Sequence, residues 1–421
     1  MIFNFLMTCF LLCPAANTAT AGAAQDWFSS RALNGHKLEA LPDGDSLTAA
    51  RLALIEQAQH SIYISAFTYK TDPTAQDFTA RLCAKARAGV DVRLLLDGRG
   101  SKDFLKKQAK ALTACGAHVL DYEPLDWGLF YFRESMHEKL MIVDGQHIIT
   151  GGSGYAHYYA VASLQTQKWH DLDIKLSGPS ACWYHYRFIR NWRKTVGMEL
   201  PFERKIHTGP AGAKVLEHRY GLETFTGCHA TSYGTARVYP VQANPVFDSG
   251  SWLLNTHIDA IKASRTSITL YSPYLTPDKR LVNALLDARK RGVEVTIMTN
   301  SKKTNDEPKI AIGMLYKAGR LLKAGVKVMI WNRPGMLHRK GGVYDGRWAF
   351  FGSDNLDRGA HVYNSENLAF TDDTDFVKAM TAMMASDLED CVPLTPELIG
   401  KEKGVLSFWR KHYIQAIMKY L

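Results

Sequence analysis

Several features are missing from this 421-residue sequence, and each absence narrows the class of protein. There is no low-complexity tract, and 46% of the residues are hydrophobic while 22% are charged, which is the composition of a folded globular protein. No His-Glu-x-x-His motif and no cysteine pair at metal-ligand spacing occurs. The sequence therefore predicts no metal site and no cofactor.

Charged side chains are absent from positions 1–24. The apolar run "IFNFLMTCFLLC" is too short to cross a bilayer, which takes about 20 apolar residues. Small residues follow it, so residues 1–24 are interpreted as a signal peptide cleaved near Ala21 or Ala24. No Lys or Arg stands near Met1, and an uncleaved membrane tether is the alternative. The prediction is an exported, periplasmic or secreted protein associated with a membrane, or one tethered to the inner membrane.

Cysteine is also scarce beyond the leader. The five that remain are an odd number, and their spacings suggest no disulfide framework. We expect most of them to act as small buried hydrophobes. They are Cys83, Cys115, Cys182, Cys228 and Cys391.

Basic residues are not scarce: 51 Lys and Arg face 41 Asp and Glu, a net charge of +10. This excess suits an anionic partner such as phospholipid headgroups or nucleic acid. It is equally typical of a basic soluble protein without such a partner, so charge alone selects no substrate.

The chain repeats itself. "QAQHSIYISAFTY" (57–69) corresponds to "ASRTSITLYSPYL" (263–275), and "AKARAGVDVRLLLD" (84–97) corresponds to "DARKRGVEVTIMTN" (287–300). In each block a helix end runs into an apolar, β-branched strand. Helices that alternate with strands predict an α/β sheet flanked by helices, here as two similar lobes related by internal duplication.

The repeat also sets the predicted domains. Residues 25–195 form the first lobe, the aperiodic stretch 196–239 is a connector, and residues 240–395 form the second lobe. Residues 396–421 form a basic amphipathic helix, for which a membrane interface and the protein's own core are equally suitable contacts.

The most informative repeat is "SMHEKLMIVD" (135–144) and "MLHRKGGVYD" (336–345). In an extended strand His137 and Lys139 face the same way, as do His338 and Lys340. An imidazole beside an ammonium group suits a phosphodiester, because lysine neutralises the oxyanion while histidine attacks phosphorus or transfers a proton. Displacement at phosphorus needs both a nucleophile and an acid, and two facing copies supply both.

These motifs resemble the signature His-x-Lys-x4-Asp of the phospholipase D superfamily, which is intact twice with Asp144 and Asp345. The resemblance covers nearly the whole chain beyond the leader and implies the phospholipase D-like fold. It also implies a carboxylate behind each histidine, for which "WHDLDIKLSGP" (169–179) and "NSENLAF" (364–370) offer Asp171 and Glu366. The two motif aspartates are expected to brace the motifs more than to touch substrate.

Within the superfamily the sequence is most similar to bacterial cardiolipin synthases and related phosphatidyltransferases, through "ITGGSGY" (149–155) and "FFGSDNLD" (350–357). By that resemblance Ser353 and Asn355 hold phosphate oxygens. The first half departs from the pattern with glycine at both matching positions, and Ser153 is a candidate substitute.

The resemblance implies that His137 attacks phosphorus to form a phosphohistidine while His338 acts as acid and base. The predicted function is transfer of a phosphatidyl group, as in cardiolipin synthesis, or hydrolysis as by phospholipase D; the motifs do not separate these. A phosphatidylglycerol-like phospholipid and a membrane surface are the expected partners, and no protein partner is inferred. The aromatic stretch 125–135 suits an acyl-chain wall or a membrane-dipping loop.

Two alternatives stay open. The first is a metal-independent nuclease of the same superfamily, for which the +10 charge would hold a nucleic-acid backbone. The second is a non-catalytic membrane-binding protein on a degenerate scaffold.

Overall fold

A computed structural model describes residues 28–122, 135–160, 169–196, 226–244 and 252–403. The first half contributes eight of the strands to a mixed sheet, with helices packed on its faces. Its strands are β1 (Leu33–Leu41), β2 (Ser61–Ala66), β3 (Asp91–Asp97), β4 (His118–Tyr122), β5 (Ser135–Met136), β6 (Lys139–Val143), β7 (His147–Gly151) and β8 (Asp173–Ser177). Its helices are α2 (Gly44–Gln57), α3 (Pro73–Arg87), α4 (Lys102–Lys107), α5 (Ala109–Ala114) and α6 (Pro179–Thr195), with a 3₁₀ turn at His157–Tyr159.

The second half repeats this order. Its strands are β9 (Ala236–Ala243), β10 (Ser267–Tyr271), β11 (Glu294–Thr299), β12 (Lys327–Trp331), β13 (Gly341–Tyr344), β14 (Trp348–Gly352), β15 (Asn364–Thr371) and β16 (Cys391–Pro393). Its helices are α8 (Trp252–Ala263), α9 (Lys279–Lys290), α10 (Pro308–Lys323), α11 (Arg358–Val362), α12 (Thr374–Glu389) and α13 (Pro396–Lys403). The duplicated α/β architecture predicted from the sequence is confirmed.

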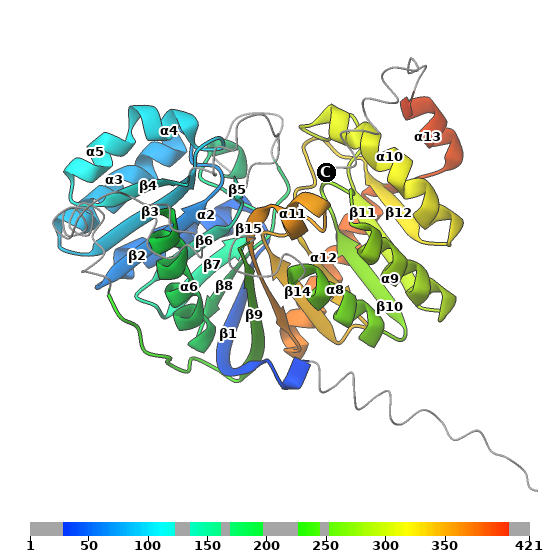
Figure 1. Ribbon diagram of the computed structural model, residues 1–421, viewed down its shortest axis with the longest axis horizontal. Helices are drawn as coiled ribbons and strands as arrows, with labels where there is room; N and C mark the ends of the chain where they lie inside the picture. The colour runs from blue at the N-terminus through cyan, green and yellow to red at the C-terminus, as the bar shows by residue number, and fades with distance from the viewer. Residues whose placement is uncertain (1–27, 123–134, 161–168, 197–225, 245–251, 404–421) are drawn as a thin grey trace, which may run out of the picture.

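The two halves share one sheet. Its order is β16-β12-β11-β10-β13-β14-β15-β9-β1-β8-β7-β6-β2-β3-β4. Outward from the β1–β9 pair, equivalent strands follow in the same sequence on both sides, and β16 is an additional strand at the second-lobe edge. That central pair is antiparallel, as expected where a pseudo-two-fold axis crosses a sheet. Figure 1 shows β1 and β9 side by side at the centre, with one lobe on each side. The lobes are therefore fixed relative to each other by backbone hydrogen bonds.

Three clusters of buried side chains hold the layers together. On one face, α2 and α3 cover the first lobe and α8, α9 and α10 cover the second, each lobe with its own apolar core. On the other face, one cluster spans both lobes and joins Phe188 and Trp192 of α6 to Phe376 and Met380 of α12. This shared core adds apolar burial to the hydrogen bonds that join the lobes.

The turns between helices and strands form as their glycines predict. Gly89 and Gly292 stand just past the ends of α3 and α9, with φ of 90° and 86°. This left-handed conformation costs a residue with a Cβ atom roughly 1–2 kcal/mol. Both glycines lie where the chain leaves a helix and turns back into the sheet.

The connector and the C-terminal helix begin close to their predicted positions. Helix α6 ends at Thr195, and β9 begins at Ala236, inside the stretch 196–239 predicted as connector. Helix α13 begins at Pro396, and its Leu398 and Ile399 pack against the second-lobe core. The leader 1–24 and residues 404–421 lie outside the described residues. Within the described part of the chain, none of the helices has the length and apolar character needed to cross a bilayer.

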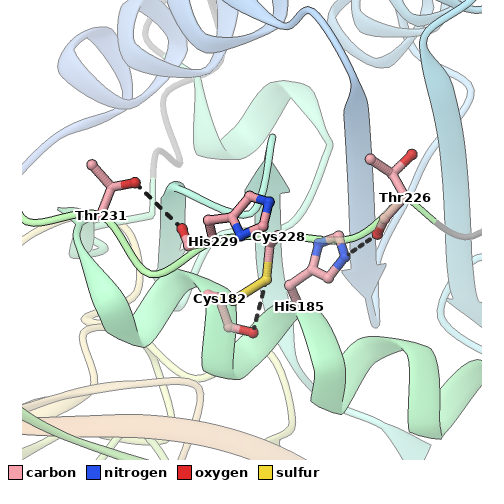
Figure 2. Close-up of a disulfide and its surroundings, with 6 residues drawn as sticks. All are labelled: Cys182, His185, Thr226, Cys228, His229 and Thr231. Carbon is pink, nitrogen blue, oxygen red and sulfur yellow. Dashed lines mark hydrogen bonds between the residues drawn. A yellow bond between two sulfur atoms is a disulfide. The ribbon is translucent and has the colours of Figure 1, made fainter.

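The cysteine prediction was wrong. Cys83 bonds to Cys115 and Cys182 bonds to Cys228, and among the described cysteines this leaves Cys391 as the free thiol. Sequence spacing could not show this, because the partners are 32 and 46 positions apart and are brought together by packing. In Figure 2 the second disulfide fastens the segment around Cys228 to α6, close to where the His185 ring contacts the Thr226 carbonyl.

Candidate active site

Each histidine of the repeated motif is held by the backbone of the opposite lobe. Strand β5, just before His137, pairs in parallel with β15, and the His137 amide donates to the Ser365 carbonyl at 3.0 Å. The symmetric contact is a bridge between His170 and Leu337, where the His338 amide donates to the His170 carbonyl at 2.7 Å. At the site, a short segment of each lobe therefore pairs with the backbone of the other lobe, and neither motif is positioned by its own lobe alone.

The carboxylates behind the histidines are exchanged in the same way. His137 Nδ1 lies 2.7 Å from Glu366 Oε1, and His338 Nδ1 lies 2.7 Å from Asp171 Oδ2. Each pair joins an imidazole from one lobe to a carboxylate from the other. A carboxylate at Nδ1 fixes the ring orientation and leaves Nε2 to face a reacting atom.

The motif lysines lie beside their histidines. Lys139 Nζ donates to the His137 carbonyl at 2.7 Å, and Lys340 Nζ donates to the His338 carbonyl at 2.6 Å. Lys340 Nζ is also 2.9 Å from each ring nitrogen of His338. Both lysines are buried, with 3% and 0% of their surface exposed, so each charge is poorly hydrated unless an anion joins it.

Burial dominates the electrostatics of these groups. It lowers the pKa of Lys139 to about 7 and that of Lys340 to about 8, and the Lys340 ammonium group lowers the pKa of Lys139 further. Burial and the two lysines hold the pKa of both histidines well below the usual value. Burial also raises the pKa of Glu366 to about 8 and raises that of Asp171. Neither histidine is therefore a free imidazolium at neutral pH, and a bound anion would favour the charged form of both lysines.

The sequence did not identify a second pair of supports, Asp97 and Asn300. Asp97 Oδ2 accepts the Met136 amide at 3.0 Å. Asn300 brackets Leu337, because Oδ1 accepts its amide at 3.0 Å and Nδ2 donates to its carbonyl at 2.8 Å. Asp97 is the last residue of β3, and Asn300 follows β11 at the equivalent position of the repeat. Both hold the residue just before a motif histidine. A polar residue at the same place in both repeats was the available signal.

The motif aspartates lie away from the histidines, in the hairpin turns after β6 and β13. Asp144 and Asp345 have φ of 51° and 55°, and each is followed by a glycine that also has positive φ, as tight hairpins require. Asp144 accepts the backbone amides of residues 59–61, and Asp345 accepts those of residues 265–267. Their geometry is that of braces that join each hairpin to the loop before β2 or β10.

The two halves differ around the carboxylates. The Ser353 hydroxyl donates to Glu366, whereas the matching Gly152 lies so near Asp171 that a Cβ atom there would be 1.9 Å from Oδ1. Aspartate is one methylene shorter than glutamate, so its carboxylate stays closer to its own backbone. In this position the Asp171 carboxylate fills the space that a side chain at position 152 would need. Glycine at that position is explained by close approach of the carboxylate.

The three phosphate-binding candidates do not occupy equivalent positions. Ser353 and Asn355 are buried at the second-lobe end of the site, and Asn355 Oδ1 has no protein partner among the described residues. Ser153 does not occupy the equivalent place, because its hydroxyl hydrogen-bonds Asp173. By repeat alignment Ser153 matches Asp354, and successive extended residues face opposite ways. The phosphate-binding role of Ser153 therefore stays a prediction, and its hydroxyl is placed differently from that of Ser353.

Aromatic side chains surround the histidines unevenly. The Trp169 ring centroid is 4.6 Å from that of His338, with Tyr159 at 6.1 Å and Tyr274 at 6.3 Å. On the other side Phe67 lies 5.3 Å from His137. The predicted aromatic wall at 125–135 lies outside the described residues except Ser135.

One group within the described residues has the composition of a metal site. His257, Asp354 and His361 are buried, with potential ligand atoms within 4.8 Å of one another. Asp354 Oδ2 is 2.7 Å from His257 Nε2 and 3.3 Å from His361 Nε2, which are hydrogen-bond distances. Burial alone would raise the pKa of Asp354, but the two histidines outweigh it and lower that pKa. The cluster is a hydrogen-bonded triad in which one carboxylate joins two histidines, and it braces the Ser353–Asn355 segment.

A duplicated sheet with two imidazoles, two ammonium groups and exchanged carboxylates defines a phosphodiester-processing class of site. The sequence matches the family model described as "Cardiolipin synthase, PLD-like domain" over residues 52–163 and 257–388. The chain belongs to this phospholipase D-like family, as the repeated motifs had indicated.

Named relatives and solved structures agree with this assignment. The cardiolipin synthase of Listeria monocytogenes is 26% identical over 390 residues, covering 92% of this chain and 75% of that protein. The major cardiolipin synthase of Bacillus subtilis is 28% identical over 360 residues, covering 84% and 69%. The crystal structure of phosphatidylserine synthase from Haemophilus influenzae has a TM-score of 0.69 with 14% identity, over 96% of this chain and all of that one. The last likeness establishes the fold.

Proposed function

We propose that this protein is a phosphatidyltransferase that moves a phosphatidyl group from one alcohol to another through a phosphohistidine, as in cardiolipin synthesis. The observation that carries the proposal is that His137 and His338 come from opposite lobes, each with Nδ1 on a carboxylate of the other lobe. Both motif lysines act on both rings and lower the pKa of each, so the two histidines share one site. Relatives named cardiolipin synthases support a phospholipid as the substrate, and the two buried lysines suit its phosphate anion.

The first half-reaction uses His137 as the nucleophile. Its Nε2 lone pair attacks phosphorus, the bond from phosphorus to the leaving alcohol breaks, and His338 gives that oxygen its proton. Asp171 stabilises the charged form of His338 that must donate. The side chain of His137 is 13% exposed and that of His338 is 5% exposed. The more exposed histidine is the better placed to reach a lipid phosphate, which supports His137 as the nucleophile.

The second half-reaction reverses these roles. His338, now neutral, takes the proton of an acceptor hydroxyl, whose oxygen attacks phosphorus and breaks the phosphorus–nitrogen bond. Lys139 and Lys340, with Ser353 and Asn355, would stabilise the non-bridging oxygens in both steps. Water as acceptor gives hydrolysis to phosphatidate instead of transfer. A phosphatidylglycerol-like lipid is the proposed donor and acceptor.

A direct assay separates the candidate functions. Purified protein is incubated with phosphatidylglycerol vesicles, with and without added glycerol, and in parallel with single- and double-stranded DNA in the presence of a chelator. We expect cardiolipin-like products and, with H137A or H338A, none. H229A, which alters an exposed histidine beside the disulfide, is the matched control and should behave as the wild type.

Each alternative has its own outcome. DNA cleavage with unchanged lipids would replace the lipid proposal with a nuclease. Vesicle binding without any turnover would favour the non-catalytic reading. Phosphatidate without lipid transfer would make the protein a phospholipase D.

We also propose that the protein is exported, periplasmic or secreted, and associated with membrane. Two disulfides support this, because such bonds persist in oxidising compartments. Trapping thiols in intact cells should leave the four paired cysteines unlabelled. N-terminal sequencing of the native protein should find the chain starting near residue 22 or 25. Reduced cysteines with an intact leader would instead indicate a protein that faces the cytoplasm.

A further inference from the structure

The two lobes place opposite charges near the site. After β3 of the first lobe comes Arg99, whose guanidinium donates to the Ser135 hydroxyl, two residues before His137. After β11 of the second lobe comes Asp306, an exposed carboxylate that accepts a hydrogen bond from the Tyr274 hydroxyl at 2.7 Å. The proposed mechanism uses Asp306 in neither half-reaction, so its place near the site needs a separate explanation.

Tyr274 connects Asp306 to the catalytic centre. The edge-on contact between the Tyr274 ring and the His338 imidazole has a centroid distance of 6.3 Å. Because the hydroxyl of that ring donates to Asp306, a single side chain links the carboxylate to the imidazole. Burial lowers the pKa of His338, and the negative charge of Asp306 acts in the opposite direction. Asp306 is therefore close enough to affect the proposed acid and base.

The loop that carries Asp306 is fastened to the same frame as His338. Asn305 Nδ2 donates to the Pro273 carbonyl at 3.3 Å, and Asn300 Nδ2 reaches that carbonyl at the same distance. Asn300 also brackets Leu337, the residue before His338. A carboxylate fixed in this way can select a ligand by position as well as by charge.

The chemistry of the surroundings limits what Asp306 can bind. A carboxylate repels phosphate, so the donor phosphate is not its partner. It accepts hydrogen bonds from hydroxyl groups and attracts ammonium groups, but Lys139 and Lys340 nearby disfavour a cationic ligand. A neutral alcohol with several hydroxyls fits best: one is activated by His338 and another donates to Asp306.

Building on the proposed function, we infer that Asp306, oriented by Tyr274, binds a non-reacting hydroxyl of the acceptor, so that the enzyme prefers polyol acceptors of the glycerol type. Tyr274 is a positioning residue in this arrangement. Its hydroxyl holds the carboxylate, while its ring contacts His338.

The test is a competition between two acceptors in one tube. The donor is a phosphatidyl ester of p-nitrophenol, and the acceptors are equimolar glycerol and 1-propanol, which lacks the two further hydroxyls. The measured quantity is the ratio of phosphatidylglycerol to phosphatidylpropanol, which does not depend on how much enzyme is folded. D306N should lower this ratio about tenfold, as expected when a hydrogen bond to a charged group is lost. Y274F should lower it in the same direction, and D375N, at an exposed acid of α12, should not.

The outcomes separate this inference from the proposed function. If the wild type makes both lipids and the ratio is the same in D306N and Y274F, the acceptor site is refuted while phosphatidyl transfer stands. A parallel arm with ethanolamine that responds to D306N, while glycerol use does not, would also overturn the polyol assignment. If the wild type makes neither lipid, phosphatidyl transfer itself fails.

Discussion

His137 and Glu366 are 229 positions apart, come from different lobes, and meet at 2.7 Å between Nδ1 and Oε1. The pair has a counterpart in His338 and Asp171, with the lobes exchanged and the same distance. Each half of the duplication therefore lacks one component of its own site, which explains why the two halves are joined by a continuous sheet and a shared core.

The carboxylates should matter through the rings they orient. E366Q and D171N keep the shape of each side chain but remove the carboxyl group that fixes the tautomer of its histidine and can share its proton. We expect kcat for phosphatidyl transfer to fall about 10²–10⁴-fold with little change in KM. Steady-state kinetics on phosphatidylglycerol vesicles measures this. Near-normal kcat in both variants would show that the exchanged contacts do not serve the chemistry.

The lysines predict an alkaline limit to activity. Their lowered pKa values, about 7 for Lys139 and about 8 for Lys340, mean that they lose protons at a lower pH than ordinary lysines. Loss of a proton removes positive charge that binds phosphate, so kcat/KM should decline as pH rises through 7–8. Bound phosphate raises both pKa values, so kcat should decline at a higher pH than kcat/KM. A pH profile with constant kcat/KM up to pH 10 would contradict the role of these groups.

The motif aspartates should affect stability more than chemistry. Asp144 and Asp345 each accept three backbone amides, and D144A or D345A leaves those donors without their protein acceptor. We expect each substitution to lower the free energy of unfolding by roughly 1–3 kcal/mol. Denaturant titration measures the loss, and kcat per folded molecule should be largely retained. Unchanged stability with abolished turnover would place these carboxylates in the reaction.

Gly152 should be intolerant of a side chain even though its repeat partner is a serine. G152S puts a Cβ atom 1.9 Å from Asp171 Oδ1, so the carboxylate must move away from His338. We expect kcat to fall about as far as in D171N. G227S is the matched control, since a Cβ atom at Gly227 meets nothing within 4 Å. Wild-type kcat in G152S would show that Asp171 does not need its present position.

Features formed by residues close together in the sequence could be predicted, and contacts between residues far apart in the sequence could not. The strands, the helix-ending glycines and the motifs are local patterns repeated twice, so they were predictable. The exchange of carboxylates between lobes was not, because nothing in the sequence shows that β5 pairs with β15. The disulfides were missed for the same reason: their cysteines have no counterpart in the second half and meet only through packing.

Ser153 shows a different limit. Its position in the repeat was known, but one residue along an extended chain reverses the direction of a side chain. Its hydroxyl hydrogen-bonds Asp173, whereas the hydroxyl of Ser353 donates to Glu366. The aromatic side chains around His338 come from separate segments and had no common sequence signal.

The central claim is that both histidines act on one phosphorus atom, His137 as nucleophile and His338 as acid and base. The most direct measurement is to trap the covalent intermediate with the phosphatidyl ester of p-nitrophenol, whose leaving group needs no acid. H338A should attack this donor but lack the base for the second step, so mass spectrometry should find a phosphatidyl adduct on His137 approaching one per chain. H137A should carry none. An adduct on His338 in H137A, or no adduct in H338A while p-nitrophenol is still released, would contradict the account.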